Sequence, residues 1–326
     1  MTMSETVAAL MQDRKGILAA DESIETMNKR LEAVGVAPTA ESRAQYRTLL
    51  VTTPAIEQYL SGVIFFEETL RLTVADGTAV PKFLASKNIL SGIKVDQGIG
   101  DDGLTRGLDG LRERLVEYKN LGATFTKWRA TAKVGDARDS ATLGENAERF
   151  AAYVSECHAL NLVPIVEPEV LMDGTHSAEE AEAAIIQTIA GVCDVLKRHG
   201  VDLTAVVLKT SMAVSGKSAT TRANAAEVAE RTVRALTTSV PDHIGGVVFL
   251  SGGQAPDEAM ANLNAIARLE PLPWSITFSF ARALQEPVLD LWRGDPTQTD
   301  EAQSLFLQRL MMAAAADAAG YVQTMK

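Results

Sequence analysis

The stretch Leu203-Thr204-Ala205-Val206-Val207-Leu208 is a short apolar run that ends at Lys209. Runs of this length and composition are typical of parallel strands that are buried on both faces of a sheet. A lysine at the end of such a strand is unusual, because burial disfavours its ammonium form. A neutral amine is a nucleophile toward carbonyl groups, so this stretch indicates both a buried sheet and a reactive site.

Similar apolar runs followed by polar residues recur about eight times along the chain. They cover residues 16–20, 61–66, 89–93, 122–126, 162–166, 203–208, 244–250 and 274–278. Helical patterns separate many of them, over roughly residues 143–159 and 223–237 and after Asp109 and Pro256. The clearest helix begins at Ser177, which is placed to form a capping box with Glu180, and ends at Gly200.

Eight alternating strand and helix units predict a closed (β/α)8 barrel, also called a TIM barrel. The alternative is an open doubly wound sheet, which normally carries a Gly-x-Gly-x-x-Gly motif after an early strand, and no such motif follows the first or the second apolar run. No linker or low-complexity segment divides the chain. We therefore expect a single TIM-barrel catalytic domain over residues 1–326, with a C-terminal helix near residues 300–320 packed outside the barrel.

The composition narrows the class of protein. Hydrophobic residues make up 46% of the chain, and the net charge of -11 at pH 7 disfavours a general nucleic-acid binder. No apolar run approaches the ~20 residues that a membrane span needs, and the N-terminus has no signal-peptide pattern. We expect a cytoplasmic protein in which Cys157 and Cys193 are reduced core thiols. The four histidines form no close metal-binding group, so we expect neither a metal nor a cofactor.

Polar side chains follow most of the predicted strands. They are Asp21, Lys94, Lys127, Arg129, Glu167, Glu169, Lys209, Ser251, Ser279 and Arg282. Active sites of such barrels form at the C-terminal ends of the strands. Because strand side chains alternate, Lys127 and Arg129 share a face, as do Glu167 and Glu169. One charge at a strand end is usually solvated or paired, but the recurrence of lysines and carboxylates at these positions favours a functional site.

The residue types suit a specific chemistry. A lysine near other cations can attack a ketone to form an imine, and the protonated imine accepts electrons when a neighbouring carbon–carbon bond breaks. The scheme needs groups that move protons and expel water, and the available carboxylates are Glu167, Glu169 and Asp21. It needs no metal ion.

Two groups of residues suggest phosphate recognition. Ser251-Gly252-Gly253 precedes a predicted helix that starts near Pro256, so backbone N–H groups can approach an anion there. Arg282, after the eighth run, supplies a fork-shaped donor, and barrels often bind phosphate with the loops after strands seven and eight. A second cluster, Lys94 with Arg129, could hold another phosphate across the mouth, with Lys29-Arg30 as a further candidate.

The sequence closely resembles the class I (Schiff-base) fructose-1,6-bisphosphate aldolases. The matching stretches occur in family order and extend over nearly the whole chain. They are residues 16–23, 92–96, 127–129, 163–169, 208–209, 249–254, 277–279 and 282–285.

The resemblance implies reversible cleavage of fructose 1,6-bisphosphate to dihydroxyacetone phosphate and glyceraldehyde 3-phosphate, in glycolysis and gluconeogenesis. Lys209 would form the imine, and Glu167 would be its acid/base, tuned by Glu169 and Lys127. Asp21 would act at the hydroxyl next to the scissile bond. One phosphate would be held by Ser251, Gly252, Ser279 and Arg282, and the other by Ser23, Lys94 and Arg129. The family usually forms homotetramers, and we expect a homo-oligomer.

Some positions depart from the family pattern. Ile24-Glu25-Thr26 replaces the common Thr-Gly-Ser, so Thr26 keeps a hydroxyl for phosphate while Glu25 adds a negative charge. Ala281 replaces a glycine beside Arg282. The chain ends at Lys326 without the tyrosine-ended tail of many eukaryotic members, so we expect another group, or water, to move that proton.

Two alternatives to this function remain open. The first is a related Schiff-base lyase or transferase that acts on another phosphosugar, since the differences at Glu25 and Ala281 could shift specificity. The second is a non-catalytic binding protein on the same fold.

Overall fold

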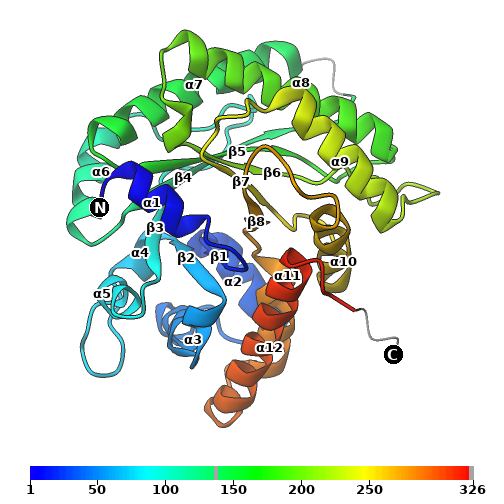
Figure 1. Cartoon of the computed structure of the whole chain (residues 1–326). Helices are drawn as coiled ribbons and strands as arrows, with labels where there is room; N and C mark the ends of the chain where they lie inside the picture. Colours follow the sequence, from blue (N-terminus) through cyan, green and yellow to red (C-terminus); the bar gives the residue numbers. More distant parts are fainter. Residues whose placement is uncertain (136–138, 323–326) are drawn as a thin grey trace.

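The computed structural model describes residues 1–135 and 139–322, and the predicted (β/α)8 barrel is confirmed (Figure 1). Eight strands form one sheet in sequence order, and each consecutive pair is parallel. The strands are β1 (Gly16–Ala20), β2 (Leu60–Phe65), β3 (Leu90–Lys94), β4 (Phe125–Ala132), β5 (Val163–Val170), β6 (Val207–Thr210), β7 (Gly246–Phe249) and β8 (Ile276–Phe278).

The barrel is nearly closed. In the described part of the chain no strand ladder joins β8 to β1. Instead, the Ala19 N–H donates to the carbonyl oxygen of Phe280 at 2.9 Å, and the Thr277 hydroxyl donates to the carbonyl oxygen of Lys15 at 3.0 Å. We call this junction between β8 and β1 the seam.

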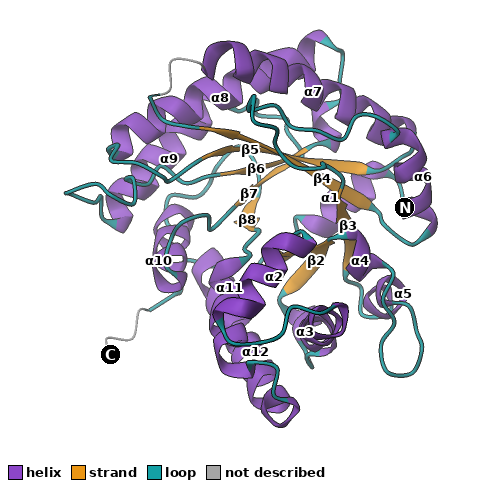
Figure 2. Ribbon diagram, turned by 180° about the vertical axis from the view of Figure 1, so that it is seen from behind, coloured by secondary structure: helices purple, strands orange, loops and turns teal. Residues whose placement is uncertain are grey.

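Helices surround the strands on the outside, as the view from behind shows (Figure 2). They are α1 (Met3–Leu10), α2 (Ile24–Ala33), α3 (Ala40–Thr52), α4 (Glu67–Leu70), α5 (Val80–Ala85), α6 (Leu111–Asn120), α7 (Asp139–Ala159), α8 (Ala178–Arg198), α9 (Ala225–Ser239), α10 (Pro256–Ala267), α11 (Arg282–Trp292) and α12 (Thr299–Asp317). The capping box predicted for α8 is present, since the Ser177 hydroxyl accepts from Glu180 N–H and Ser177 N–H donates to the Glu180 carboxylate. The predicted C-terminal helix is α12, which packs on α10 and α11 outside the barrel.

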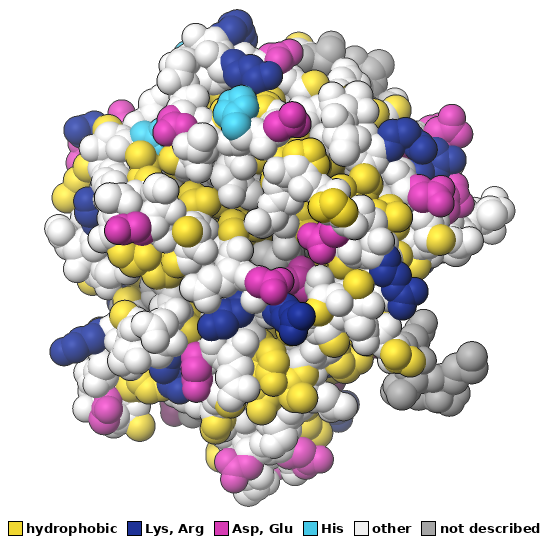
Figure 3. Space-filling model, in the orientation of Figure 1, with side chains coloured by type: hydrophobic (Ala, Val, Ile, Leu, Met, Phe, Trp, Pro, Cys, Tyr) yellow, Lys and Arg dark blue, Asp and Glu magenta, His cyan; other side chains and the backbone are white. Residues whose placement is uncertain are grey.

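One end of the barrel is filled by apolar side chains. Helix α1 covers this end, where Val7 and Leu10 pack against the inward-facing Ile17, Ile64 and Phe125 (Figure 1). Lys and Arg side chains on this face are interspersed with Asp and Glu rather than gathered into one basic surface (Figure 3). The functional site must therefore lie at the opposite end, where the strands finish.

The predicted strand ends were wrong for β4 and β5. Both strands continue past their apolar runs, to Ala132 and Val170, so Lys127, Arg129, Glu167 and Glu169 lie within strands. The backbone ladder continues through this region and pairs Arg129 with Glu167. Inward-facing charges satisfy one another there, so polarity does not end the strand. The run at residues 203–208 differs in the other direction, since it begins with a short 3-10 turn, Leu203–Ala205, and β6 starts only at Val207.

Cys157 and Cys193 are buried free thiols, as expected. Burial raises the pKa of each to about 12, which makes both thiols unreactive. Among the described helices, none combines the length and the hydropathy that crossing a membrane would require.

Asp317, at the end of α12, gives the fold a predictable pH dependence. Only 8% of the residue is exposed, and Oδ1 has no hydrogen-bond partner among the described residues. Burial, with the nearby Glu270 and Asp13, raises the pKa of Asp317 to about 8. The folded protein therefore holds this proton more tightly than the unfolded chain, in which an aspartate titrates near ~3.9. This contribution to stability is complete below about pH 3.9, the pKa of the unfolded chain, and is lost as the pH rises through 8.

The variant Asp317→Asn stays neutral at every pH and should be more stable than the parent protein at pH 9, by about 2 kcal/mol. The difference should shrink toward pH 5. Urea unfolding at pH 5, 7 and 9 measures it, with the exposed Asp242→Asn as control. A difference that does not vary with pH would contradict this assignment.

Candidate active site

A cavity of about 1210 Å³ opens at the C-terminal ends of the strands. All but one of the site residues predicted from the sequence line it: Asp21, Ser23, Thr26, Lys94, Lys127, Arg129, Glu167, Glu169, Lys209, Ser251, Gly252, Ser279 and Arg282. They come from seven strands, or from the loops that follow them, and from the first turns of α2 and α11.

Gly253 is the predicted residue that does not line the cavity. Its φ of +79° favours glycine, so its role is to turn the chain before α10. Gly252 does reach the cavity, and a Cβ there would lie 2.6 Å from Oε1 of Glu169. The absence of a side chain at Gly252 thus lets the loop after β7 approach the carboxylates of β5.

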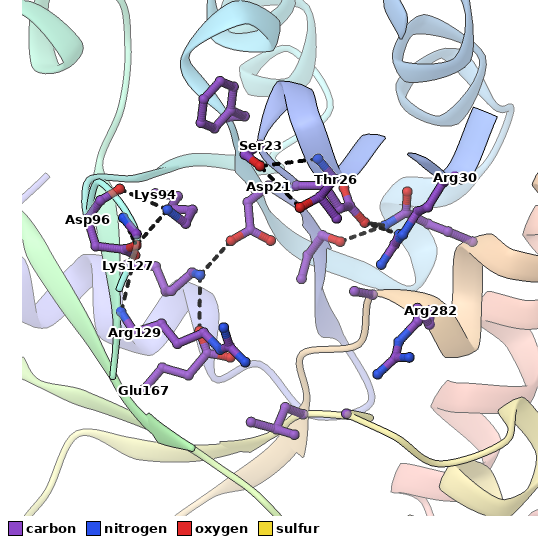
Figure 4. Close-up of a pocket in the computed structure, with 18 of the residues that line it drawn as sticks. Asp21, Ser23, Thr26, Arg30, Lys94, Asp96, Lys127, Arg129, Glu167 and Arg282 are labelled. Atoms are coloured by element: carbon purple, nitrogen blue, oxygen red, sulfur yellow. Dashed lines mark hydrogen bonds and ion pairs between the residues drawn. The ribbon is translucent and has the colours of Figure 1, made fainter. Parts of the chain in front are cut away.

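The floor of the cavity is a chain of four buried, alternately charged side chains. Lys209 Nζ lies 3.0 Å from Glu167 Oε1, and Lys127 Nζ lies 3.0 Å from Glu167 Oε2. Lys127 Nζ also contacts Asp21 Oδ2 at 2.6 Å (Figure 4). The lysine that ends the apolar run is therefore in direct contact with a carboxylate.

Strand alternation explains how these groups meet. On β4, Lys127 lies two residues after Phe125, which faces the apolar interior, so Lys127 faces the same way. Glu167 follows Ile165 on β5 and Lys209 follows Val207 on β6 with the same spacing. The charged layer therefore lies directly on the apolar interior of the barrel.

The ion pairs keep Asp21, Glu167 and Lys127 ionised despite their burial. Burial opposes the charged form of Asp21, but Lys127 and Lys209 outweigh it and hold the pKa of Asp21 well below its usual range. Burial also opposes ionisation of Glu167, and Lys127 and Lys209 again lower its pKa. Burial favours the neutral amine of Lys127, yet Asp21 and Glu167 raise its pKa above the usual range. At neutral pH the floor therefore contains two ionised carboxylates beside the ammonium group of Lys127.

One side of the cavity carries a cationic cluster formed by Lys94 and Arg129. Arg129 Nε donates to the carboxylate of Glu169. Burial opposes the charge of Arg129, but Glu169 raises its pKa above the usual range. Lys94 Nζ contacts Asp96 Oδ1 at 2.6 Å, and Asp96 also accepts from the backbone N–H of Arg129. Asp96 was not predicted as a site residue, although it follows Lys94 by two positions on the same side of the chain.

The opposite side carries Arg282 and Ser279. In the described ranges, no carboxylate forms an ion pair with Arg282, whose guanidinium points into the cavity (Figure 4). Ser279 is 1% exposed, and its Oγ has no hydrogen-bond partner within residues 1–135 and 139–322. An anion bound between them would receive charge-assisted donation from the guanidinium and a hydrogen bond from the hydroxyl.

The first turn of α2 forms a further part of the rim. Ser23 caps this helix, since its Oγ accepts from the Thr26 N–H at 3.3 Å and lies 3.1 Å from the Thr26 hydroxyl. The unusual Glu25 is exposed and contacts Lys29 at 2.6 Å, so its charge is neutralised locally. Arg30 lines the cavity and pairs with the buried carboxylate of Glu22, whose role the sequence did not predict.

No group of three or more His, Cys, Asp or Glu side chains within the described ranges is arranged to hold a metal ion. The polar groups that line the site are amines, carboxylates and anion-binding groups. A buried lysine beside a carboxylate, between two anion-binding clusters, is an arrangement suited to imine chemistry on a phosphorylated ketone.

Comparison with known proteins agrees with this geometry. The family model for fructose-bisphosphate aldolase class-I matches residues 2–326. A probable fructose-bisphosphate aldolase class 1 of Xanthomonas campestris pv. campestris is 43% identical over 315 residues, which cover 94% of each chain. The fructose-bisphosphate aldolase of Plasmodium falciparum is 42% identical over 94% of this chain and 86% of its own.

A crystal structure of the Plasmodium falciparum aldolase has the same fold. It superposes with a TM-score of 0.95 at 40% identity, over 99% of this chain and 95% of the crystallised chain. The family model, the two relatives and the crystal structure each match almost the entire length of this chain. The chain therefore belongs to the class I fructose-bisphosphate aldolase family.

Proposed function

We propose that this chain cleaves fructose 1,6-bisphosphate reversibly to dihydroxyacetone phosphate and glyceraldehyde 3-phosphate, through an imine on Lys209. The observation that carries the proposal is the buried contact of Lys209 with Glu167, at the floor of a cavity with cationic groups on two sides. Membership of the family supports the same activity.

In this scheme Lys209 transfers a proton to Glu167 and adds its amine to the C2 ketone. Glu167 then protonates the resulting hydroxyl, which leaves as water and gives the protonated imine. Asp21 takes the proton of the C4 hydroxyl, the C3–C4 bond breaks, and its electron pair passes into the imine to form an enamine. Protonation at C3 and hydrolysis of the imine release dihydroxyacetone phosphate and restore the amine.

Lys127 would keep both carboxylates ionised between turnovers, since it contacts Asp21 and Glu167 at 2.6 and 3.0 Å. Glu169 would orient Arg129 at the entrance to the cavity. The C1 phosphate would lie against the group that follows β7 and β8, namely Ser251, Gly252, Ser279 and Arg282. The C6 phosphate would lie against Ser23, Thr26, Lys94 and Arg129 across the cavity.

Borohydride trapping with dihydroxyacetone phosphate tests the nucleophile. Reduction should leave one stable adduct, on the peptide that contains Lys209, when the protein is digested and mapped by mass spectrometry. An adduct on Lys127 or Lys94 would keep the reaction class and overturn the assignment of roles. Activity that survives borohydride without any adduct would exclude the imine mechanism.

The specificity for a bisphosphate is tested at Lys94. Lys94→Met should raise KM for fructose 1,6-bisphosphate about tenfold, because one charge-assisted contact to the C6 phosphate is lost. KM for fructose 1-phosphate, which lacks that phosphate, should change by less than about twofold. Steady-state kinetics with both substrates make the comparison. An equal change for both would favour a related lyase or transferase whose substrate does not reach Lys94.

We infer a cytoplasmic enzyme that needs no cofactor and assembles as a homotetramer. The inference about assembly and location rests on the resemblance to the family, together with the free thiols and the acidic net charge. Light scattering coupled to gel filtration measures the assembly, for which four chains of 34.9 kDa are expected.

A further inference from the structure

Gln285 forms a buried link between α11 and β1. The residue is 1% exposed, and its Nε2 donates to the carbonyl oxygen of Ala19 at 2.7 Å and to Glu22 Oε1 at 3.1 Å. Its Oε1 accepts from Arg47 on α3 at 3.4 Å. The amide thus uses both its donor and its acceptor sides to join three elements that are far apart in sequence.

This link lies at the seam, where the barrel has the fewest backbone contacts. Both backbone groups of Ala19 bond across the seam. Its N–H donates to the carbonyl oxygen of Phe280, and its carbonyl oxygen accepts from the Gln285 amide. Two residues later the chain reaches Asp21 at the cavity floor. Gln285 therefore supplies the side-chain contact that replaces a strand ladder next to the site.

Arg282 depends on the same turn of α11. It precedes Gln285 by three residues, so the two lie on the same side of the helix. With no carboxylate pairing to Arg282 in the described ranges, the place of its guanidinium is set by the backbone of this turn. The turn is also held by the Tyr46 hydroxyl, which donates to the Gln285 carbonyl at 2.8 Å, and by Arg309, which donates to the carbonyl of Ala283.

Glu22 anchors the link from the side of β1. Its side chain is 6% exposed and contacts Arg47 at 2.5 Å as well as Arg30. Burial opposes the carboxylate, but Arg47 and Arg30 hold the pKa of Glu22 below its usual range. A charged acceptor in a buried place makes a stronger hydrogen bond to the Gln285 amide than a neutral one would.

We propose that Gln285 is a positioning residue, which holds Arg282 at the distance from Lys209 that a phosphorylated ketone requires. This inference rests on the proposed function, in which Arg282 binds the phosphate next to the imine. Gln285 lines the cavity, but its amide is bonded to Ala19, Glu22 and Arg47. It therefore acts through the first turn of α11 and through the end of β1.

The test compares two ketones that form the same imine. Dihydroxyacetone phosphate needs Arg282 for its phosphate, whereas dihydroxyacetone has none. In Gln285→Met, the concentration of dihydroxyacetone phosphate for half-maximal borohydride trapping on Lys209 should rise about tenfold. The concentration for dihydroxyacetone should stay within about twofold, which a merely loosened fold would not allow.

Gln303→Met is the matched control. The Gln303 amide also joins two helices, with bonds of 3.1 Å to the Leu49 carbonyl and to the Thr52 hydroxyl, but it lies outside the cavity. This variant should leave both half-maximal concentrations unchanged. If Gln285→Met does not fold, Tyr46→Phe removes one bond to the same turn, and it should raise only the value for the phosphorylated ketone, about twofold to threefold.

Equal changes for both ketones in Gln285→Met, or no change for either, would overturn the positioning role. If Gln285→Met does not fold, the same outcomes in Tyr46→Phe would overturn it. Absence of an adduct on Lys209 in the parent protein would overturn the proposed function itself, and this inference with it. Trapping on Lys209 without a selective effect at Gln285 would remove the inference alone.

Discussion

Replacement of Lys209 by methionine should lower kcat for fructose 1,6-bisphosphate cleavage by about 10⁴-fold or more, because the nucleophile is lost. Methionine matches the length of the buried lysine stem, and Glu167 keeps its contact with Lys127 at 3.0 Å, so the fold should persist. A coupled assay for the triose products measures kcat, and borohydride trapping should give no adduct.

The exposed Lys119→Met serves as a control for the loss of one lysine, and its activity should equal that of the parent protein. A Lys209→Met protein that keeps about 1% of the activity, with an adduct on another lysine, would show that the nucleophile is elsewhere.

Replacement of Lys127 by methionine should lower kcat by about 10²- to 10⁴-fold and move the acid side of the pH–activity profile upward. Lys127 holds the pKa of Asp21 and of Glu167 below the usual range, against the effect of burial. Without this cation both pKa values rise, so the ionised carboxylates are lost at a higher pH as the solution is acidified. We expect the acid side of the profile to move up into the measured range, recorded as kcat from pH 4 to pH 10.

The same change should destabilise the protein. Carboxylates with depressed pKa values contribute stability above the pKa of the unfolded chain and lose it as the pH falls through the folded value. Lys127→Met leaves Asp21 without its closest counter-ion, at a cost of about 3–5 kcal/mol at pH 7 in urea unfolding.

Lys87→Met is the control for this loss of stability. It breaks a surface ion pair with Glu57 and should lower the free energy of unfolding by about 1 kcal/mol or less. An unchanged acid side of the profile in Lys127→Met would mean that other cations, not Lys127, keep these carboxylates ionised.

The sequence predicts the barrel because its strands are buried on both faces and leave apolar runs with regular spacing. The run before Lys209 and the capping box at Ser177 are local signals, and each was read correctly up to a few residues at its ends. The ends of β4 and β5 were missed because the inward charges of one strand are satisfied by those of the next. Pairing of that kind depends on residues some 40 positions apart, which no local pattern contains.

For the residues around the site, too, local patterns predict some features and long-range contacts decide the others. Motifs with side chains two apart, such as Lys127 and Arg129, predict which groups face the cavity. Glu22 is adjacent to the predicted Asp21, and Gln285 lies three residues after the predicted Arg282. The partners of Glu22, however, come from α3 and from across the seam, 25 and 263 positions away. Their role appears only when the barrel brings both ends of the chain together.

The regular spacing of Phe125 and Lys127, and of Ile165 and Glu167, constrains how this chain can change in length. Deletion of a single residue within β4 would turn every later side chain of that strand from the cavity toward the helices, and the charges with it. Deletion of two residues would keep these side chains facing the cavity and would only move the charged layer closer to the apolar interior of the barrel. Insertions and deletions should therefore be tolerated only in the loops between the elements, where the length of the chain can vary without inverting the catalytic face.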